Sequence, residues 1–497
     1  IRRQRQMCIR DSGVFYLRIE DTDKKREVEN GVSLIVKGLN DFGIEIDEGM
    51  LSETDEKGAY GPYTQSKRKD IYQAYVKSLV EQGLAYPCFM TEEELATIRE
   101  KQESEKLLPG VYGEFAKYRD ITVEEAQKRI ENGDEYVVRL KSPGKEDKRI
   151  KFKDVIKGEI EMPENILDVV LLKKDGTPTY HFAHVVDDHL MRTTHVIRGD
   201  EWISSVPIHL QLFWLCGLKP PKYAHISPIM KEENGGKRKL SKRKDPEAAV
   251  SYYSEVGYPK GAIWEYLMTL ANSNYEDWRL ANPNEDIDNF KFSFSKMSKA
   301  GALFDMVKLA DVSKNYICRL SAEEVYEMVT DWAKENNKKL YKLLVDDEEY
   351  AKAIFAIERG NAKPRKDISA WTDVENYVSY FYSELWDRKF DFPDNLSNDD
   401  MIEILELYKQ IYDENVSSDD WFPQVRDMAE TIGYAKAPKV YKKDPDSYKG
   451  HVGDVAGVIR VAATGRRNTP DLYEILQVLG KDEVMKRFDE AIESLRG

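Results

Sequence analysis

The sequence predicts an α/β domain with a second domain inserted into it, followed by an all-helical C-terminal region. Three observations lead to this prediction. A strand, a polar turn and an amphipathic helix follow one another over residues 14–42; charged helices and short strands replace that pattern over 86–164; and strand patterns almost vanish after residue 244. The chain has 497 residues, enough for several domains that each bury a core.

The first α/β unit begins with an apolar strand over 14–19 that runs into the acidic cluster Glu20-Asp21-Thr22-Asp23. Apolar residues then recur at helical spacing, which predicts a helix over 28–42, and a second helix is expected over 68–83. Strand, turn and helix in this order are typical of a parallel α/β unit.

The α/β pattern resumes at residue 168, after the predicted insertion, which includes a strand over 136–141. We expect a β-hairpin from 168–172 and 179–186, joined by a turn with Asp175-Gly176. A strand over 194–197 and a helix over 206–216, capped by Ser204 or Ser205, should follow. In the helical region, the proline-broken stretch 390–400 predicts a division into two modules.

Composition excludes several classes of protein. The longest apolar stretches are far shorter than the roughly 20 residues of a membrane span, so we expect no membrane partner. The 4 cysteines are scattered without a Cys-x-x-Cys pair, which fits a reducing cytoplasm better than a disulfide framework. With a net charge of -15, the protein would have to hold any RNA by local basic patches.

Polar side chains gather where the predicted strands end. Strand alternation places each of three sets on one face: Arg18 with Glu20; Tyr180 with His184; and Arg198, Asp200 with Trp202. Ligands bind at this edge of open α/β sheets, and such a set could recognise an amino acid by its charges. A buried salt-bridge network is the alternative, and spacing alone leaves both open.

Four of the 7 histidines lie between His181 and His195, which raises the possibility of a zinc site. On a strand, His181 and His184 would point to opposite faces, and Asp187-Asp188 would form a turn. We therefore expect no metal there.

A basic segment, Lys237-Arg238-Lys239-Leu240-Ser241-Lys242-Arg243-Lys244-Asp245, follows Gly235-Gly236. Lysines beside a glycine hinge suit a triphosphate, whose charge they would stabilise as pyrophosphate leaves. A solvated basic run or a nonspecific RNA contact is the alternative.

Five motifs occur in one order, and together they closely resemble those of glutamyl-tRNA synthetases. They are Leu17-Arg18-Ile19-Glu20-Asp21-Thr22-Asp23, Gly61-Pro62-Tyr63-Thr64-Gln65-Ser66, Thr179 to His189, Val196-Ile197-Arg198-Gly199-Asp200-Glu201-Trp202, and Lys239-Leu240-Ser241-Lys242-Arg243. The last resembles that family's form of the Lys-Met-Ser-Lys-Ser loop of class I synthetases. The resemblance extends to the C-terminus, where 458–462 and 468–472 are similar to the anticodon-binding region.

The resemblance implies a Rossmann-type catalytic domain with an inserted acceptor-stem-binding domain, then an all-α anticodon-binding domain. The expected boundaries are a non-native junction over 1–12, a first catalytic segment over 13–85, the insertion over 86–179, a second catalytic segment over 180–235, a stem-contact fold with the phosphate-binding loop over 236–320, and anticodon modules over 321–390 and 391–497.

The resemblance also implies a reaction and a site. Glutamate and ATP would form glutamyl-adenylate, and the glutamyl group would pass to the 3' end of tRNA(Glu). Residues expected to bind glutamate are Glu20, Tyr180, His184, Arg198 and Trp202. Residues expected to contact ATP are Glu201, Met230, Lys239, Leu240 and Lys242, with Lys239, Ser241, Lys242 and Arg243 in the catalytic loop and Mg²⁺ sharing the phosphate charge. A cytoplasmic monomer is expected.

The chain departs from the family's pattern in two places. No His-Ile-Gly-His-type signature occurs, so we expect that an opening strand is missing before Gly13 and that the chain as written is inactive. Some relatives carry zinc in the insertion, starting from a Cys-x-Cys pair, whereas Cys88-Phe89-Met90 has one thiol, so no zinc is expected.

Three rival functions are weighed against this one. Glutaminyl-tRNA synthetases have β-barrel anticodon modules, whereas 321–497 has helical periodicity, and a tRNA-modifying paralogue would lack this region. A noncatalytic tRNA-binding protein would be separated from an enzyme by a pyrophosphate-exchange assay. Whether tRNA(Gln) is also charged stays open, since a few anticodon contacts decide it.

Overall fold

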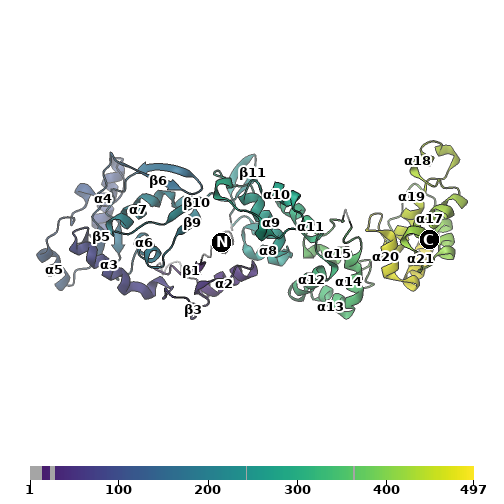
Figure 1. The fold of residues 1–497 in the computed structure, drawn as a ribbon, viewed down its shortest axis with the longest axis horizontal. Helices are drawn as coiled ribbons and strands as arrows, with labels where there is room; N and C mark the ends of the chain where they lie inside the picture. Colours follow the sequence, from purple (N-terminus) through teal and green to yellow (C-terminus); the bar gives the residue numbers. More distant parts are fainter. Residues whose placement is uncertain (1–13, 23–27, 242, 362–363) are drawn as a thin grey trace. The chain divides into compact units, whose positions relative to one another are not determined.

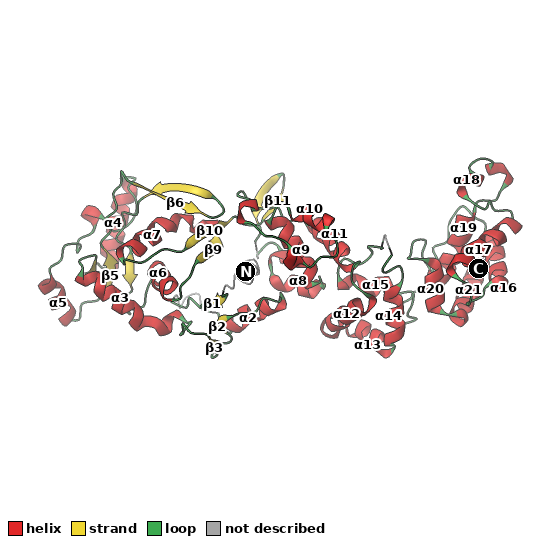
Figure 2. Cartoon of the chain, in the orientation of Figure 1, coloured by secondary structure: helices red, strands yellow, loops and turns green. Residues whose placement is uncertain are grey.

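The computed structural model describes residues 14–22, 28–241, 243–361 and 364–497, so the predicted junction over 1–12 lies outside the described residues. The chain forms two compact units, of which unit 1 comprises Ile1–Ala248 with Leu267–Phe304 and unit 2 comprises Ala249–Tyr266 with Asp305–Gly497 (Figure 1). Figure 2 shows strands in unit 1 and helices with loops in unit 2, as the sequence predicts. None of the described helices is long and apolar enough to cross a membrane.

Unit 1 contains the strands. Their bounds are β1 Tyr16–Leu17, β2 Glu48–Met50, β3 Glu56–Lys57, β4 Ala85–Cys88, β5 Val137–Leu140, β6 Arg149–Asp154, β7 Gly158–Pro163, β8 Val170–Leu172, β9 His195–Gly199, β10 Lys222–Ile226, β11 Met230–Glu233 and β12 Gly236–Lys239. Its helices are α2 Gly31–Asp41, α3 Lys69–Glu81, α4 Glu92–Ser104, α5 Val123–Glu131, α6 Tyr180–Leu190, α7 Val206–Leu215 and α10 Tyr275–Ala281, and α9 Lys260–Ala271 has residues of both units.

The parallel α/β unit at the start of the chain is confirmed. β1 pairs in parallel with β2, and α2 lies between them in the sequence, with α3 following. β9 and β10 form a second parallel pair, with α7 between them. α3, α6 and α7 bury their apolar side chains against β4, β5 and β8 in one core, which includes Tyr72, Leu140, Phe182 and Phe213.

The predicted strand over 179–186 is wrong, because this segment belongs to the helix α6. The turn at Asp175-Gly176 is present, with Gly176 at φ 72°, but the chain beyond it pairs with β8 through a single bridge from Pro178 to Leu172. Residues 182–188 are all buried, so hydrophobicity shows neither the period of a strand nor that of a helix. Short apolar runs of this kind are ambiguous in sequence.

The predicted cap of α7 is also wrong, although the helix lies where expected. Ser205 occupies the N-cap position but makes no side-chain cap hydrogen bond and has helical φ and ψ. A 3₁₀ helix, η4 Asp200–Ser205, runs directly into α7 and leaves no extended residue in which a serine could cap.

Two hairpins complete unit 1. β6 pairs with β7, and β6 also lies beside β10, where Val155 N–H donates to Tyr223 O over 2.8 Å (Figure 1). β11 and β12 are joined by Asn234 and Gly235, whose φ values of 52° and 77° are those of a type I′ turn. The beginning of the expected basic loop is therefore a strand, and its Asn-Gly signal explains why.

Unit 2 is helical in its described residues. Its helices besides α9 are α8 Val250–Val256, α11 Met306–Ile317, α12 Ala322–Asn336, α13 Lys338–Asp346, α14 Glu348–Ala356, α15 Val374–Val378, α16 Asn398–Ile411, α17 Ser418–Thr431, α18 Pro438–Tyr441, α19 Val452–Thr464, α20 Leu472–Leu479 and α21 Lys481–Arg496. One continuous apolar core extends from Ile317 to Leu495. The expected interruption is present as a helix-free stretch before α16.

Candidate active site

Three aromatic and cationic side chains meet between α6, β9 and η4. Tyr180 is the first residue of α6, and its ring centroid lies 4.6 Å from that of Trp202 in η4. Arg198 in β9 donates from Nη1 to the Tyr180 hydroxyl over 3.3 Å, and its Cζ lies 5.9 Å from the centroid of the Trp202 ring. The structure thus brings together three of the five residues expected to bind glutamate.

His184 is the fourth of these residues and lies one turn after Tyr180 on α6. The two rings stack with their centroids 5.9 Å apart. Both ring nitrogens have partners, since Nδ1 lies 3.0 Å from Asp188 Oδ2 and Nε2 lies 3.1 Å from the Tyr223 hydroxyl. The ring of His184 can therefore line the pocket, while its two nitrogens remain paired with Asp188 and Tyr223.

Glu20, the fifth residue, follows β1 and is bonded to Arg18, whose Nη2 lies 3.3 Å from Glu20 Oε1. The two side chains share a face, as strand alternation predicted. Burial is the main cause that raises the pKa of the Tyr180 hydroxyl, and the negative charge of Glu20 is the next. Glu20 therefore lies close enough to the aromatic pocket to influence it electrostatically. Arg18 is in turn bound by Asp188 at 2.8 Å, and Asp188 and Asp187 raise its pKa against the opposing effect of burial.

Asp187 and Asp188 do not form the expected turn, because both lie on α6 and are buried. Asp187 accepts hydrogen bonds from Arg68 Nε at 2.8 Å, Tyr72 Oη at 2.8 Å and Gln65 Nε2 at 3.0 Å. Asp187 and Asp188 thus form a buried salt-bridge network with Arg18 and Arg68. Such a network was the alternative considered for the set that includes Arg18.

His181 and His184 are not separated by opposite strand faces as expected, because they lie three residues apart on a helix. Both contact His209, with ring centroids at 5.1 and 4.4 Å. Within the described ranges, however, no group of at least three His, Cys, Asp or Glu side chains is arranged to hold a metal ion.

Arg198 is surrounded by neutral acceptors. Its Nε donates to His225 Nε2 over 3.1 Å, and its Nη1 and Nη2 both lie 3.3 Å from His209 Nδ1. Nη2 also donates to the Trp202 carbonyl over 3.3 Å. No carboxylate of the described residues lies within ion-pair distance of this guanidinium. Its charge is therefore uncompensated at close range.

His209 and His181 are held neutral. Burial, and next the charges of His184 and Arg198, lower the pKa of His181 to about 4. The same causes, in the same order, lower the pKa of His209. His209 Nδ1 must accept from Arg198, so its Nε2 carries the proton and donates to His181 Nδ1 over 3.0 Å.

The expected ATP residues that the structure describes lie in or near the β11–β12 hairpin. Met230 begins β11 and is the Cα partner of Lys239, which ends β12. Lys239 Nζ lies 4.0 Å from Glu201 Oε1, and both side chains are more than half exposed. Since Glu201 and Trp202 are neighbours in η4, this short helix connects the hairpin to the aromatic pocket.

A buried carboxylate fixes the base of the basic loop. Asp245 accepts two hydrogen bonds from Arg238, at 2.6 and 2.7 Å, and one from the Ser241 N–H at 2.9 Å. Lys231 adds a bond of 3.2 Å. The hydrogen bonds from Arg238 are the largest of the causes that lower the pKa of the Asp245 carboxyl. Arg238 is thus used within the loop, whereas Lys237, Lys239, Arg243 and Lys244 are exposed cations.

The structure describes most of the remaining loop residues. Leu240 N–H donates to Ile229 O over 2.9 Å, which ties the loop to the residue before β11. Lys242 lies outside the described residues.

The predicted strand face of Arg198, Asp200 and Trp202 is wrong beyond Gly199, because the strand β9 ends there and the 3₁₀ helix η4 begins at Asp200. Asp200 instead pairs with Lys157 at 3.2 Å.

Three residues around Arg198 were not predicted from the sequence: Asp154, His209 and His225. Each is buried and lies on a different element, so no local spacing links them. A buried histidine in an apolar helix, such as His209 in α7, is a weak signal because most are satisfied core residues.

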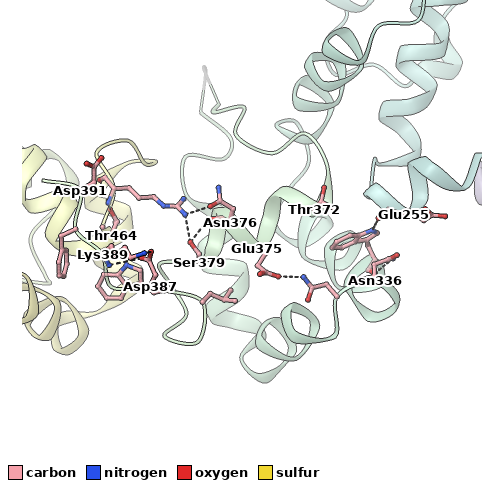
Figure 3. Close-up of a pocket in the computed structure, with 17 residues that line it drawn as sticks. Glu255, Asn336, Thr372, Glu375, Asn376, Ser379, Asp387, Lys389, Asp391 and Thr464 are labelled. Carbon is pink, nitrogen blue, oxygen red and sulfur yellow. Dashed lines mark hydrogen bonds and ion pairs between the residues drawn. The ribbon is translucent and has the colours of Figure 1, made fainter. Parts of the chain in front are cut away.

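A large open cavity of about 930 Å³ lies in unit 2, and none of the expected glutamate or ATP residues lines it (Figure 3). Asn376 and Ser379 line it and accept hydrogen bonds from Arg466 at 2.7 and 2.9 Å, and Asn337 donates to Glu375 over 2.5 Å. Its lining mixes charged and polar groups of both signs with the apolar side chains of Trp332, Leu385, Trp386 and Phe390, so it is neither a purely apolar pocket nor a basic surface.

Two protein-family models match parts of this chain. Residues 7–311 match the family model for tRNA synthetases class I (E and Q), catalytic domain. Residues 446–492 match an anticodon binding domain.

Individual proteins are similar over nearly the whole chain. The glutamate–tRNA ligase of Clostridium perfringens strain SM101 is 54% identical over 487 residues, which cover 97% of this chain and 88% of that protein. The glutamate–tRNA ligase of Clostridium beijerinckii is 50% identical over 98% of this chain and 89% of that protein. A crystal structure of a glutamate tRNA ligase from Elizabethkingia meningosepticum, in complex with its amino acid, superposes with a TM-score of 0.76 at 28% identity, covering 99% of this chain and 94% of that one. The chain belongs to the glutamate–tRNA ligases, which are class I aminoacyl-tRNA synthetases.

Proposed function

We propose that Arg198, Tyr180 and Trp202 bind the side-chain carboxylate of glutamate, with the ring of His184 behind them and Glu20 at the amino-group side. As a glutamate–tRNA ligase, the enzyme uses glutamate, ATP and tRNA. These five residues would hold the first of the three substrates.

The uncompensated guanidinium of Arg198 carries this proposal. A partly buried charge is costly unless it is paired, and Arg198 has neutral partners in the described residues. Its contacts through Nη1 and Nη2 are long, at 3.3 Å, and a carboxylate could replace them with shorter, charge-assisted bonds. A glutamine amide has no charge to offer, so the same feature would favour glutamate over glutamine.

We also propose that ATP binds along η4 and the β11–β12 hairpin. Glu201, Met230 and Leu240 would contact the nucleotide, and the loop side chains of Lys239, Ser241, Lys242 and Arg243 would contact its phosphates. The glutamate α-carboxylate would attack the α-phosphate to give glutamyl-adenylate and pyrophosphate. The exposed ammonium of Lys239 is suited to stabilising the charge that develops on the leaving phosphates.

Magnesium would enter with ATP. The described residues offer no cluster of three or more carboxylate, histidine or cysteine ligands, which fits an ion held mainly by substrate phosphates. When bound there, Mg²⁺ would neutralise phosphate charge. We propose no structural zinc, and we expect a monomer that acts in the cytoplasm.

The regions proposed to hold tRNA are 86–179 and 236–320 for the acceptor arm, and 321–390 and 391–497 for the anticodon. The match of residues 446–492 to an anticodon binding domain supports the last of these assignments. tRNA(Glu) is the proposed substrate, to which the glutamyl group passes at the terminal ribose hydroxyl.

The variant Arg198→Gln tests the glutamate assignment. In the enzyme expressed from its complete gene, losing a charge-assisted hydrogen bond worth about 1.5–3 kcal/mol should lower kcat/KM for glutamate at least about tenfold. The KM for ATP should stay unchanged. Lys77→Gln, which removes an exposed cation of α3 outside the regions proposed to hold tRNA, is the control and should change neither value. An Arg198→Gln enzyme with full kcat/KM for glutamate would refute the assignment.

A further inference from the structure

A buried Asp–His pair, Asp154 with His225, fixes the guanidinium of Arg198. Asp154 ends β6 and is 1% exposed, and His225 lies in β10 and is 0% exposed. His225 Nδ1 lies 2.7 Å from Asp154 Oδ2, which also accepts the His225 backbone N–H over 3.1 Å. Asp154 Oδ1 accepts the N–H groups of Ile156 and Lys157, at 2.9 and 2.7 Å. Both carboxylate oxygens are therefore held in place.

The partners determine which nitrogen of His225 carries the proton. An ionised carboxylate can only accept, so His225 Nδ1 must donate to Asp154. Arginine can only donate, so His225 Nε2 must be the acceptor for Arg198 Nε, which lies 3.1 Å away. Burial raises the pKa of Asp154, but its hydrogen bonds from His225, Lys157 and Ile156 outweigh burial and lower it, which keeps the carboxylate ionised.

We infer that Asp154 and His225 are positioning residues of the glutamate pocket, which act by holding Arg198 in the orientation that receives the substrate carboxylate. With Nε taken by His225, the side of the guanidinium that includes Nε is closed to the substrate. The edge formed by Nη1 and Nη2 is then directed at Tyr180 and Trp202 by the shorter contact at Nε. This inference rests on the proposed role of Arg198.

The same pair supplies a countercharge at a distance. Asp154 is an ionised side chain connected to Arg198 through a neutral ring, so it offsets part of the cost of burying the guanidinium without occupying its substrate-binding edge. A carboxylate in direct contact with Arg198 would compete with glutamate. The intervening histidine avoids this competition.

A purely structural role is the alternative, since Asp154 also connects β6 to β10 through the His225 N–H. The two roles differ in what a substitution changes. Loss of a structural link lowers stability, whereas loss of positioning raises the KM for glutamate and leaves the KM for ATP unchanged.

Kinetics of four variants separate these roles in the enzyme expressed from its complete gene. Asp154→Asn and His225→Phe should each raise the KM for glutamate about tenfold or more, with the KM for ATP unchanged, since they weaken a charge-assisted hydrogen bond. His225→Gln should retain more glutamate affinity than His225→Phe, because its Oε1 can take the place of Nε2 as the acceptor. Asp168→Asn is the control, a carboxylate that is also 1% exposed but bonds to Tyr86 and Arg119; it should leave the KM for glutamate unchanged.

A double variant tests whether Asp154 affects glutamate binding through Arg198. If Asp154 acts through Arg198, adding Asp154→Asn to Arg198→Gln should raise the KM for glutamate no further, and a full additive rise would overturn the inference. If Arg198→Gln raises the KM but Asp154→Asn and His225→Phe do not, the positioning role is wrong and the glutamate assignment stands. If Arg198→Gln itself has no effect, both fail.

A spectroscopic measurement covers the case in which the variants do not fold. The wild-type enzyme is labelled with [¹⁵N]histidine, and the sequence described here contributes 7 histidines to the spectrum. For His225 we expect a protonated Nδ1 and an unprotonated Nε2 at neutral pH. A protonated Nε2 would show that His225 does not accept from Arg198 and would overturn the inference.

Discussion

Arg487 should be a main support of unit 2, and its replacement by leucine should destabilise that unit selectively. Arg487 lies on α21 with a relative exposure of 1%. Its Nη1 donates to Tyr380 O over 2.6 Å and to Ala463 O over 2.7 Å, and its Nε donates to Glu483 over 2.9 Å. The guanidinium carbon lies 4.2 Å from the centroid of the Trp386 ring, so one side chain connects three segments.

The magnitude follows from these partners. Arg487→Leu leaves two carbonyl oxygens without this donor, at about 1–3 kcal/mol each, while removing a desolvated charge offsets part of the loss, so we expect a net destabilisation of about 2–4 kcal/mol. Native-state hydrogen exchange of the full chain, resolved by peptide, should show exchange in α19 and α21 accelerated roughly 30- to 800-fold, at tenfold per 1.4 kcal/mol.

Unit 1 peptides should exchange at unchanged rates in Arg487→Leu. Arg496→Leu is the matched control: this arginine of the same helix is 61% exposed and pairs with Glu406 at the surface, so its loss should change the free energy by less than about 0.5 kcal/mol. Acceleration below about fivefold in α19 and α21 of Arg487→Leu, which corresponds to about 1 kcal/mol, would refute this reasoning.

Two further predictions concern pH and the phosphate loop. Because burial lowers the pKa of His181 to about 4 and also lowers that of His209, both stay neutral in the fold while an unfolded histidine takes up a proton below about pH 6.5. Their stabilisation is thus fully present above about pH 6.5 and is lost as pH falls toward 4, by up to about 1.4 kcal/mol per pH unit for each histidine. Urea unfolding between pH 7 and 5 should show this slope, His181→Asn should make it shallower, and an unchanged slope would contradict it. Asp245→Asn should loosen the loop, since it weakens the bonds to Arg238 and Ser241. It should slow tRNA-dependent pyrophosphate exchange without changing the KM for glutamate, whereas Glu233→Gln, which removes an exposed partner of Arg238, should have little effect. Full exchange activity in Asp245→Asn would count against the loop's role.

The sequence predicted the α/β start, the helices α2, α3 and α7 and the helical C-terminal region, because each has a clear hydrophobic period or a turn signal. It failed at α6, where every residue from 182 to 188 is buried and no period remains. Tyr180 and His184 were still placed together correctly, since a spacing of four residues puts two side chains on one face of a strand and on one face of a helix. His181 and His184 are three residues apart, a spacing that puts two side chains on opposite faces of a strand but on one face of a helix. Their predicted separation was therefore wrong.

The partners of Arg198 could not be predicted from the sequence. Asp154 and His225 are 71 residues apart, and the contact exists because β6 lies beside β10, which follows from tertiary structure alone. The Asn234-Gly235 turn shows the opposite case: its signal is local, and a two-residue hairpin over the basic segment could have been predicted from it.

A crystal structure of the enzyme with glutamate bound tests the central claim most directly. We expect the side-chain carboxylate of glutamate within hydrogen-bond distance of Arg198 Nη1 and Nη2 and of the Tyr180 hydroxyl, with Arg198 Nε still donating to His225. A glutamate side chain that instead binds Arg18, with Arg198 left in contact with its neutral partners, would contradict the account.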